Sequence, residues 1–518
     1  MTELHDVTSL YAGFTAQATR RPDAVAVTDG AVEVTYRELD VAAREYRTAL
    51  AAHGVAPGDL VGISLSQGWE VAAAILAVLG HGCGYVPLDP GYPVDRLTHM
   101  VENSGVRVAF AAADRDVLPA DVARLTRAAG QPAPARPMAR PAGTPAYVIY
   151  TSGSTGVPKG VAIRESSVLC LFRSCANGLF EFGQDDAWAQ FFSYSFDFSV
   201  WEMWGALLFG GRMVVVPAET ARRPTALLEF LSTKRVTVLN LVPSYFKHLV
   251  RAYERHPAPL ALRYIVFGGE ELDRMSVRQW QGLRPAAEIL VNMYGITETT
   301  VHSTYGVLTP EWVASDAGGT WIGSSLAHLR IALLAPDGSA VPDGDPGEIH
   351  IAGSAVAIGY YGRPDLTAER FRRLRLDGDD EYRTWYRSGD IARRLPDGTY
   401  EYLGRNDRQV NLRGFRIELG EVEVALRAEP PVREAIAVIE EVAGGESVLV
   451  VYVTVNDGQA GAGLAARLRR SCATRLPAHM VPNRVVVLTE MPLSPSGKLD
   501  RARLRAGRVG TKAKEVRT

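Results

Sequence analysis

A short loop rich in glycine and hydroxyl residues carries the clearest chemistry in this sequence. Residues 151–160 read TSGSTGVPKG. The glycines allow backbone turns that point successive N–H groups inward, while the hydroxyls and Lys159 add side-chain donors and a positive charge. The sequence therefore predicts a cradle for phosphate. Its expected members are Thr151, Ser152, Gly153, Ser154, Thr155, Gly156 and Lys159.

The flanks of this loop distinguish two classes of phosphate site. Apolar residues 146–150 precede the loop and the β-branched run 161–163 follows it, so we expect the loop to join two strands. A Walker loop ends in Gly-Lys-Ser/Thr and opens a helix, whereas Lys159 is followed by glycine. The sequence thus disfavours a P-loop NTPase. A flexible Gly/Ser linker is the plain alternative, although linkers seldom end in Pro-Lys-Gly.

The elements that must position this loop follow an α/β pattern. Residues 41–52 have helical period and precede the strand-like run 60–65, and residues 70–79 and 84–88 repeat that order. The alternation predicts an α/β fold with largely parallel sheets. The proline-rich stretch 130–145 is expected to be an exposed surface loop.

A polar turn near residues 404–407 indicates a boundary, and the chain is too long for one hydrophobic core. We expect a large N-terminal domain of residues 1–406 and a small α+β domain of residues 407–507. Residues 508–518 form a basic tail that is expected to fray.

Composition excludes several function classes. The chain has 518 residues with 56 basic and 58 acidic side chains, a balance that gives no reason to expect nucleic acid. Its four cysteines lack zinc spacing and are expected to be reduced thiols. Acidic residues near the amino terminus and the lack of a long apolar run disfavour a signal peptide or a membrane span. We therefore expect a soluble cytoplasmic protein.

Further motifs follow in a fixed order along nearly the whole chain. They are VTYREL at 34–39, GYVPLDPGYPVDR at 84–96, YGITET at 294–299, YRSGD at 386–390, GRNDRQV at 404–410, LPAHMVP at 476–482 and SPSGK at 494–498. Together with the phosphate loop they resemble the core motifs of the adenylate-forming superfamily, specifically the adenylation domains of nonribosomal peptide synthetases. The resemblance implies a large N-terminal domain of stacked α/β subdomains and a small mobile C-terminal domain.

This resemblance implies a reaction and its residues. Such enzymes join an amino-acid carboxylate to the α-phosphate of ATP with Mg²⁺, then transfer the aminoacyl group to a phosphopantetheine thiol. By similarity, Lys498 bridges carboxylate and phosphate as the catalytic residue, Glu298 binds Mg²⁺, and Thr297 contacts the α-phosphate. Without the motif, Lys498 would be read as a solvated surface charge. The remaining nucleotide and hinge residues are Asn292 and Tyr294 at the adenine, Asp390 and Arg405 at the ribose, and Asp407 at the hinge.

Asp197 indicates the substrate class. It corresponds to the carboxylate that pairs with the α-ammonium of an amino acid in peptide synthetases, and it disfavours an acyl-CoA-forming relative. A charge in this aromatic neighbourhood needs a partner, because burying it alone costs several kcal/mol. The structural alternative is a helix N-cap made by Asp197 or Ser199.

Motif matching also outlines a side-chain pocket that resembles the family's threonine-specifying set, with Val266 where isoleucine is usual. The pocket residues are Asp197, Phe198, Trp201, Asn240, Val266, Gly268, Met293, Val301, His302 and Lys498. Asn240 and His302 suit a hydroxyl group, so threonine is the expected substrate. If these two side chains bond each other instead, 2-aminobutyrate or valine could compete. For His302 alone, a satisfied core histidine is the alternative.

Four positions depart from the family pattern. Asn411 replaces the usual lysine after Gln-Val, which affects the thioester-forming step rather than adenylation. Ile296 and Ser388 replace a proline and a threonine and look tolerable. Glu165 replaces a common histidine, with no consequence that the sequence alone reveals.

No carrier segment follows Lys498 and no condensation domain precedes the first motif. We therefore expect a free-standing enzyme that loads a separate phosphopantetheinylated carrier protein in natural-product biosynthesis, with a possible MbtH-like activator. A coenzyme A or amide ligase of the same superfamily is one rival. A regulatory nucleotide-binding protein is another, which the retention of Lys498, Glu298 and Asp390 disfavours.

Overall fold

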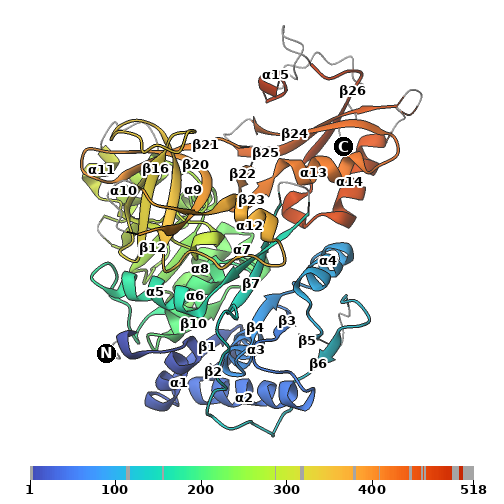
Figure 1. The fold of residues 1–518 in the computed structure, drawn as a ribbon. Helices are drawn as coiled ribbons and strands as arrows, with labels where there is room; N and C mark the ends of the chain where they lie inside the picture. Colours follow the sequence, from blue (N-terminus) through green and yellow to red (C-terminus); the bar gives the residue numbers. More distant parts are fainter. Residues whose placement is uncertain are drawn as a thin grey trace. The chain divides into compact units, whose positions relative to one another are not determined.

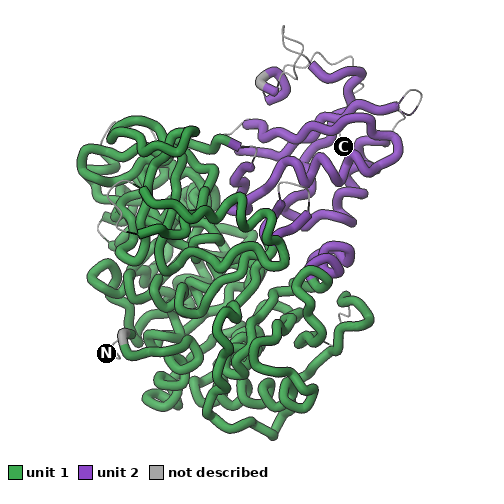
Figure 2. Tube along the Cα trace, viewed as in Figure 1, with its two compact units in different colours: residues 1–90, 101–150, 160–406 green, residues 91–100, 151–159, 407–518 purple. Residues whose placement is uncertain are grey.

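Two compact units make up the computed structural model (Figure 2). Unit 1 contains residues 1–90, 101–150 and 160–406, and unit 2 contains residues 91–100, 151–159 and 407–518. The structure describes residues 4–112, 117–153, 157–285, 287–314, 320–376, 381–407, 409–442, 446–456, 459, 463–492 and 501–505. Ser154, Thr155, Gly156, Lys498 and the basic tail lie outside the described residues, so their expected roles stay predictions.

The smaller sheet of unit 1 carries the strands on both sides of the phosphate loop (Figure 1). Its order is β18-β8-β7-β4-β3-β5-β6. The bounds are β3 (Leu60–Ser64), β4 (Gly84–Pro87), β5 (Val108–Ala111), β6 (Ala123–Leu125), β7 (Tyr147–Thr151), β8 (Lys159–Ile163) and β18 (Gly359–Tyr360). β3, β4, β5, β6 and β7 pair in parallel, and β18 is antiparallel to β8. The predicted strand–loop–strand arrangement at the phosphate loop is confirmed.

The larger sheet has the order β16-β17-β20-β21-β15-β14-β13-β12-β11-β9-β10-β1-β2, with β19 beside β20. Its first strands are β1 (Val25–Asp29), β2 (Val32–Thr35), β9 (Ala187–Gln190), β10 (Arg212–Val215), β11 (Val238–Leu241), β12 (Tyr264–Phe267) and β13 (Ile289–Asn292). The others are β14 (Thr304–Val307), β15 (Thr320–Ser325), β16 (Leu329–Leu334), β17 (Gly347–Gly353), β19 (Phe371–Leu374), β20 (Arg383–Arg394) and β21 (Tyr400–Arg405).

This larger sheet corrects one expectation. Strands β1 and β9 to β13 pair in parallel, as predicted. From β14 to β21 the described strands of this sheet pair antiparallel, so the expectation of largely parallel sheets is wrong there. The physical reason is connection length, because several consecutive strands here are joined by short turns, whereas parallel pairing needs long crossovers.

Helices cover these sheets in unit 1 (Figure 1). They are η1 (Leu4–Asp6), α1 (Leu10–Arg20), α2 (Tyr36–Ala52), α3 (Trp69–Gly80), α5 (Glu165–Ala176), α6 (Phe198–Leu207), α7 (Ala218–Ala221), α8 (Pro224–Thr233), α9 (Pro243–Arg255), α10 (Arg274–Leu283), η2 (Thr297–Thr299), α11 (Pro310–Ala314) and α12 (Pro364–Arg370). α4 (Val94–Ser104) contributes residues to both units. The predicted alternation over residues 41–88 is confirmed as α2, β3, α3 and β4.

Local sequence explains where these helices begin. Thr35 precedes α2, and its hydroxyl oxygen accepts from the Glu38 N–H at 3.2 Å, while the Glu38 carboxylate accepts from the Thr35 N–H at 2.8 Å. This capping box satisfies N–H groups that a helix start leaves unpaired. α3 follows with ten consecutive buried residues, 71–80, so it is a core helix.

An aromatic cluster supports the centre of unit 1. The Trp201 indole is fully buried and stacks on the Phe172 ring, with centroids 5.0 Å apart and planes within 9°. The Phe180, Phe182 and Trp188 rings also contact the Trp201 ring. Such ring pairs add to the free energy gained by burial. Packing against these four aromatic rings therefore holds the Trp201 side chain in place.

Unit 2 is α+β in content. Its elements are the hairpin strands β22 (Gln409–Leu412) and β23 (Phe415–Glu418), the sheet strands β24 (Val432–Val442), β25 (Glu446–Val455) and β26 (Arg484–Leu488), and the helices α13 (Leu419–Arg427), α14 (Leu464–Arg475), η3 (Ala478–Met480) and α15 (Arg501–Arg505). β24 pairs with β25 antiparallel and β25 with β26 in parallel. Buried side chains from α13, α14 and these strands form a hydrophobic core, and other side chains of the strands form a second cluster with Leu504 of α15.

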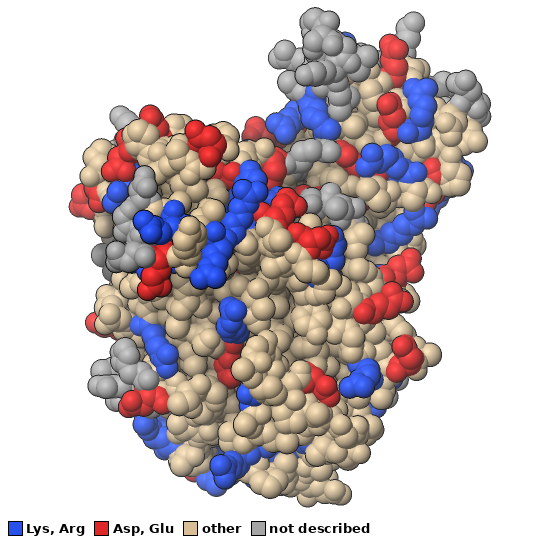
Figure 3. Space-filling view, viewed as in Figure 1, with Lys and Arg blue, Asp and Glu red and all other residues tan. Residues whose placement is uncertain are grey.

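Acidic and basic side chains are interspersed on the face drawn in Figure 3, which matches their near balance in the sequence. Among the described residues, no helix is long and apolar enough to cross a membrane.

Candidate active site

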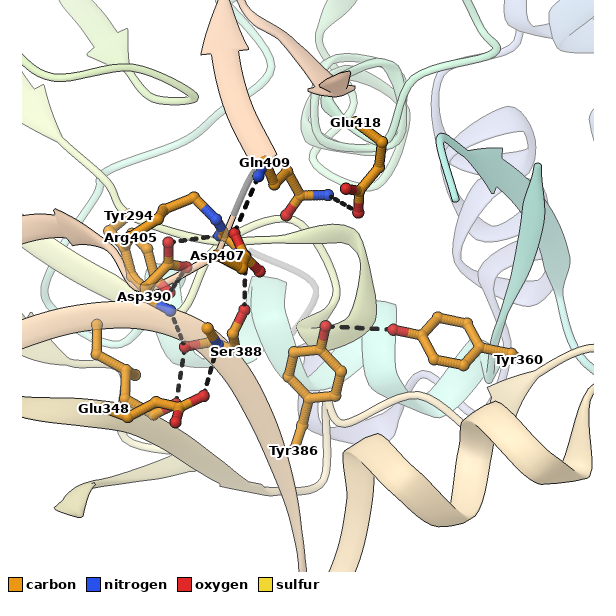
Figure 4. Close-up of polar contacts among 12 residues, drawn as sticks. Tyr294, Glu348, Tyr360, Tyr386, Ser388, Asp390, Arg405, Asp407, Gln409 and Glu418 are labelled. Atoms are coloured by element: carbon orange, nitrogen blue, oxygen red, sulfur yellow. Dashed lines mark hydrogen bonds and ion pairs between the residues drawn. The ribbon is translucent and has the colours of Figure 1, made fainter. Parts of the chain in front are cut away.

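The expected ribose residues meet at one carboxylate in unit 1 (Figure 4). Asp390 on β20 lies opposite Arg405 on β21 in the antiparallel register. The Tyr294 hydroxyl donates to Asp390 Oδ2 at 2.7 Å, and Arg405 Nη1 donates to Asp390 Oδ1. Burial and the Asp390 charge raise the pKa of Tyr294 well above its usual value, so its hydroxyl stays a donor. The structure therefore brings Tyr294, Asp390 and Arg405 together.

A second carboxylate supports this part of strand β20 (Figure 4). The Ser388 hydroxyl accepts from the Asp390 N–H at 3.0 Å, so the serine serves where the family has threonine. Glu348 accepts from the Gly389 N–H at 3.1 Å and from Arg387 Nε at 2.9 Å. Sequence reasoning missed Glu348, because β17 and β20 are distant in sequence and only their pairing brings it to the motif.

Asn292, at the end of β13, is almost fully buried. Its amide nitrogen donates to the Trp321 carbonyl oxygen at 2.6 Å. Because the amide nitrogen makes this bond, the amide oxygen Oδ1 is left to accept a hydrogen bond from another group. An exocyclic amino group such as that of adenine is a suitable donor. The adenine contact itself stays a prediction.

Glu298 lies in η2 with its side chain fully buried. The Tyr360 hydroxyl donates to Glu298 Oε1 at 2.8 Å, and the Tyr360 and Tyr386 hydroxyl oxygens lie 3.3 Å apart (Figure 4). The described part of the chain contains no group of three or more His, Cys, Asp or Glu side chains that could hold a metal. A single carboxylate is nevertheless the protein donor that Mg²⁺ uses beside phosphate oxygens and water. Glu298 therefore fits the ion together with ATP.

The loop between β13 and β14, which carries Glu298, has a strained backbone. Thr300 and Val301 have φ values of 60° and 67°, in the left-handed region that a β-branched residue rarely adopts. The Thr300 hydroxyl donates to the Ala355 carbonyl at 2.6 Å, and a Cβ added at Gly295 would lie 1.9 Å from the Val301 carbonyl oxygen. Strain of about 1–3 kcal/mol per residue clusters at functional sites, where the surroundings enforce it. His302 follows directly.

His302 stands in the predicted amino-acid pocket. Its ring lies perpendicular to the Phe198 and Trp201 rings, with centroids 5.3 and 5.0 Å away. Burial lowers the pKa of His302 to about 3, so the imidazole is neutral at physiological pH. Its buried Nε2 atom has no hydrogen-bond partner among the described residues. No described residue thus satisfies this nitrogen, which favours the predicted contact with a substrate over a satisfied core histidine.

Asn240 bonds to Trp201 rather than to His302. The Trp201 Nε1–H donates to Asn240 Oδ1 at 2.9 Å. Three further side chains of the predicted pocket are deeply buried, namely Val266, Met293 and Val301. A Cβ added at Gly268 would lie 2.7 Å from Phe198 Cζ, so the missing side chain leaves the space that this ring fills.

Asp197 directly precedes α6 and occupies its N-cap position. It has helical φ and ψ values, and its side chain makes no capping hydrogen bond to the described start of α6. The N-cap alternative is therefore wrong for Asp197. Burial raises the pKa of the Tyr147 hydroxyl well above its usual value, and the Tyr85 and Asp197 side chains add to this shift. The pairing of Asp197 with an α-ammonium group stays a prediction.

The described part of the phosphate loop belongs to unit 2. The Gly153 N–H donates to Glu421 Oε2 at 3.2 Å, and the Ser152 hydroxyl donates to the Arg416 carbonyl at 2.8 Å. A Cβ added at Gly153 would lie 1.9 Å from the Val157 carbonyl oxygen, so glycine is required. Within the described residues, the buried Thr151 Oγ1 has no hydrogen-bond partner. An N–H group that already donates to an anionic oxygen, and a hydroxyl without a described partner, fit a phosphate cradle.

The structure gives Glu165 a role. Its carboxylate accepts from the Leu10 N–H at 2.6 Å and pairs with Arg140 Nε at 3.3 Å. Burial raises the pKa of Glu165, and the Arg140 charge opposes that shift. Glu165 thus fastens α5 to the start of α1. Asn411 is exposed on β22.

Comparison with known proteins agrees with this geometry. The family model "AMP-binding enzyme" matches residues 14–361, and "AMP-binding enzyme C-terminal domain" matches residues 421–498. The chain is 40% identical over 95% of its length to the dimodular nonribosomal peptide synthase of Bacillus subtilis, of which it spans 21%. It is 37% identical over 96% of its length to syringomycin synthase SyrB1 of Pseudomonas syringae pv. syringae, of which it spans 81%.

A solved structure shows the same fold. Holo-PA1221, described as a nonribosomal peptide synthetase protein containing adenylation and PCP domains, superposes with a TM-score of 0.83 at 28% identity over 97% of this chain and 84% of that one. The chain therefore belongs to the AMP-binding enzymes, as an adenylation domain of the nonribosomal peptide synthetase type. Its class is that of the amino acid adenylating ligases, which use ATP with Mg²⁺, and the predicted α/β fold class is confirmed.

Proposed function

We propose that this chain activates L-threonine as threonyl-adenylate and then transfers it to the phosphopantetheine thiol of a separate carrier protein in natural-product biosynthesis. The observation that supports threonine is His302 Nε2, a neutral nitrogen without a described partner between two aromatic rings. A substrate hydroxyl would bond this nitrogen. A hydrocarbon side chain would leave it buried and unpaired, at a cost of about 1–3 kcal/mol.

In this proposal each group of the substrates has its own binding residues. Asp390 and Arg405 bind the ribose, Asn292 and Tyr294 bind the adenine, and Asp197 pairs with the α-ammonium group. Mg²⁺ at Glu298 would neutralise charge on the phosphate oxygens during transfer. Thr297 contacts the α-phosphate, and Lys498 bridges carboxylate and phosphate, which stabilises the charge of the in-line transition state.

Transfer to a carrier protein is the second proposed step. The likeness to holo-PA1221, a protein that contains adenylation and PCP domains, supports such a partner. Asp407 is the proposed hinge about which the small domain changes orientation between the two steps. We place the enzyme in the cytoplasm, where ATP and amino acids are supplied.

Amino-acid-dependent exchange of pyrophosphate into ATP tests the first step. The purified chain is assayed with each common amino acid and 2-aminobutyrate, with and without an added MbtH-like protein. A dominant threonine signal is expected, with valine lower by roughly 10⁴-fold if the hydroxyl is read, and serine lower by about 1–3 kcal/mol for the missing methyl. A dominant 2-aminobutyrate or valine signal would refute threonine and retain the enzyme class.

Carrier loading tests the second step. Phosphopantetheinylated carrier proteins are incubated with the chain, ATP and radiolabelled amino acid. Acylation is then measured as the increase in the mass of the carrier protein. Robust adenylate formation without acylation of any candidate carrier would count against transfer. Formation of a coenzyme A thioester would instead favour the rival ligase class.

A further inference from the structure

A buried carboxylate lies directly behind the amino-acid pocket. Glu202 follows Trp201 on α6 and is fully buried. Its Oε2 accepts from the Phe192 N–H at 3.2 Å, and its Oε1 accepts from Asn240 Nδ2 at 3.5 Å. In the described part of the chain, its partners are thus N–H donors. Neither the motifs nor the expected pocket include Glu202.

The chemistry of the indole fixes which way the Asn240 amide points. A tryptophan Nε1–H can only donate, so the Asn240 atom that faces Trp201 must be the carbonyl oxygen. The amide nitrogen therefore faces Glu202 and needs an acceptor there. A carboxylate supplies one for this nitrogen and another for the Phe192 N–H at the same time.

We propose that Glu202 is a positioning residue for amino-acid recognition. It fixes the orientation of the Asn240 amide, and the Asn240 amide fixes the position of the Trp201 indole. The Trp201 indole in turn positions the His302 ring, which contacts the substrate side chain. The last step rests on packing, because the His302 ring lies at 90° to the Trp201 ring with centroids 5.0 Å apart. Asn240 is then committed to Trp201 and Glu202, and His302 Nε2 is the polar atom left for the substrate. This inference rests on the proposed function and deepens it.

Burial explains why such a residue has a strong effect. It raises the pKa of Glu202 well above the usual range, while the Phe192 and Asn240 N–H groups oppose that shift. A buried polar network is costly to leave partly unsatisfied. Glutamine keeps the shape of Glu202 but must turn its NH₂ group toward one of two donors, Asn240 Nδ2 or the Phe192 N–H. Glu202→Gln therefore breaks one bond without changing volume.

The test compares Glu202→Gln, Asn240→Ala and the double variant in pyrophosphate exchange, with the amino acid that the wild type activates best. Glu202→Gln is expected to lower kcat/KM for that amino acid about tenfold, as one unsatisfied buried donor predicts. KM for ATP should stay within about twofold. In the Asn240→Ala background, Glu202→Gln should lower kcat/KM by less than about a further twofold, because the Asn240 amide through which Glu202 acts is already absent.

Two further variants keep the test decisive. Ser199→Ala, on the same helix and also buried, is the matched control and should leave amino-acid kinetics unchanged. Trp201→Phe removes the indole N–H from the other end of the network, so it should reproduce the selective loss even if Glu202→Gln fails to fold. Equal losses for ATP and amino acid, fully multiplicative losses in the double variant, or unchanged kinetics in Trp201→Phe would overturn the proposal. A wild type that prefers another amino acid would refute threonine alone.

Discussion

At the scale of single residues, His302 governs the proposed substrate choice. Replacing His302 by leucine removes Nε2 while keeping an apolar side chain of similar size. The preference for threonine over valine, measured as the ratio of kcat/KM in pyrophosphate exchange, should fall by roughly tenfold or more, since one hydrogen bond to a buried group is worth about 1–3 kcal/mol. Valine activation should rise or stay level.

The companion variant His302→Gln restores a hydrogen-bonding amide at this place. It should recover part of the threonine preference, because an amide can also bond a hydroxyl. An unchanged threonine-to-valine ratio in His302→Leu would refute hydroxyl recognition by this residue.

Buried histidines also make stability depend on pH. Burial lowers the pKa of His302 to about 3 and that of His328 to about 4. In the unfolded chain these groups bind protons near pH 6.5, so the unfolded state holds more protons between about pH 3 and 6.5. Stability from the neutral histidines is thus present above about pH 6.5 and is lost as pH falls.

The thermal unfolding midpoint, followed from pH 7.5 to 4.5, should therefore decline more steeply in the wild type than in His302→Leu. The exposed His256 serves as control, and His256→Gln should keep the wild-type slope. Parallel slopes for wild type and His302→Leu would show that His302 is not held neutral by burial.

At the scale of elements, the strained loop between β13 and β14 carries Thr297, Glu298 and His302. Gly295→Ala should disturb it, because the new Cβ would lie 1.9 Å from the Val301 carbonyl oxygen. We expect a loss of about 1–3 kcal/mol in stability, as overpacking typically costs, and a marked loss of pyrophosphate exchange.

Gly282 near the end of α10 offers a matched control, since a Cβ there would meet nothing within 4 Å. Gly282→Ala should be neutral or stabilising by about 0.5–1 kcal/mol, with normal exchange. Thermal unfolding and exchange assays compare the two variants. Similar behaviour of both would contradict a special requirement for glycine at position 295.

At the scale of the whole molecule, the proposed hinge at Asp407 lets the small domain change its orientation between the two half-reactions. Asp407 Oδ1 accepts from the Gln409 N–H at 3.1 Å, which closes a short local turn. Proline at 407 fixes φ near −65° and resists rotation. Asp407→Pro should keep pyrophosphate exchange within about threefold and lower carrier loading by roughly tenfold or more.

Asp407→Ala is the control for this variant. It removes the side-chain bond but leaves φ free, so both steps should persist. Equal loss of exchange and loading in Asp407→Pro would show that position 407 affects folding or the first step rather than a rotation between steps.

Local order was predictable from the sequence because it depends on neighbours in the chain. The phosphate loop between β7 and β8 and the alternation from α2 to β4 follow from glycine content and apolar period over short windows. The antiparallel half of the larger sheet was not predicted, because the residue patterns of its strands resemble the residue patterns of parallel strands.

The family follows from the amino-acid sequence alone, because its motifs are local strings in a fixed order, and the same motifs indicate the residues around Asp390. Only the tertiary structure decided which polar atoms are already bonded. Asn240 is committed to Trp201 and Glu202, while His302 Nε2 has no described partner. Hydrogen bonding and burial depend on residues that are distant in the chain and meet only when helix, sheet and loop pack together.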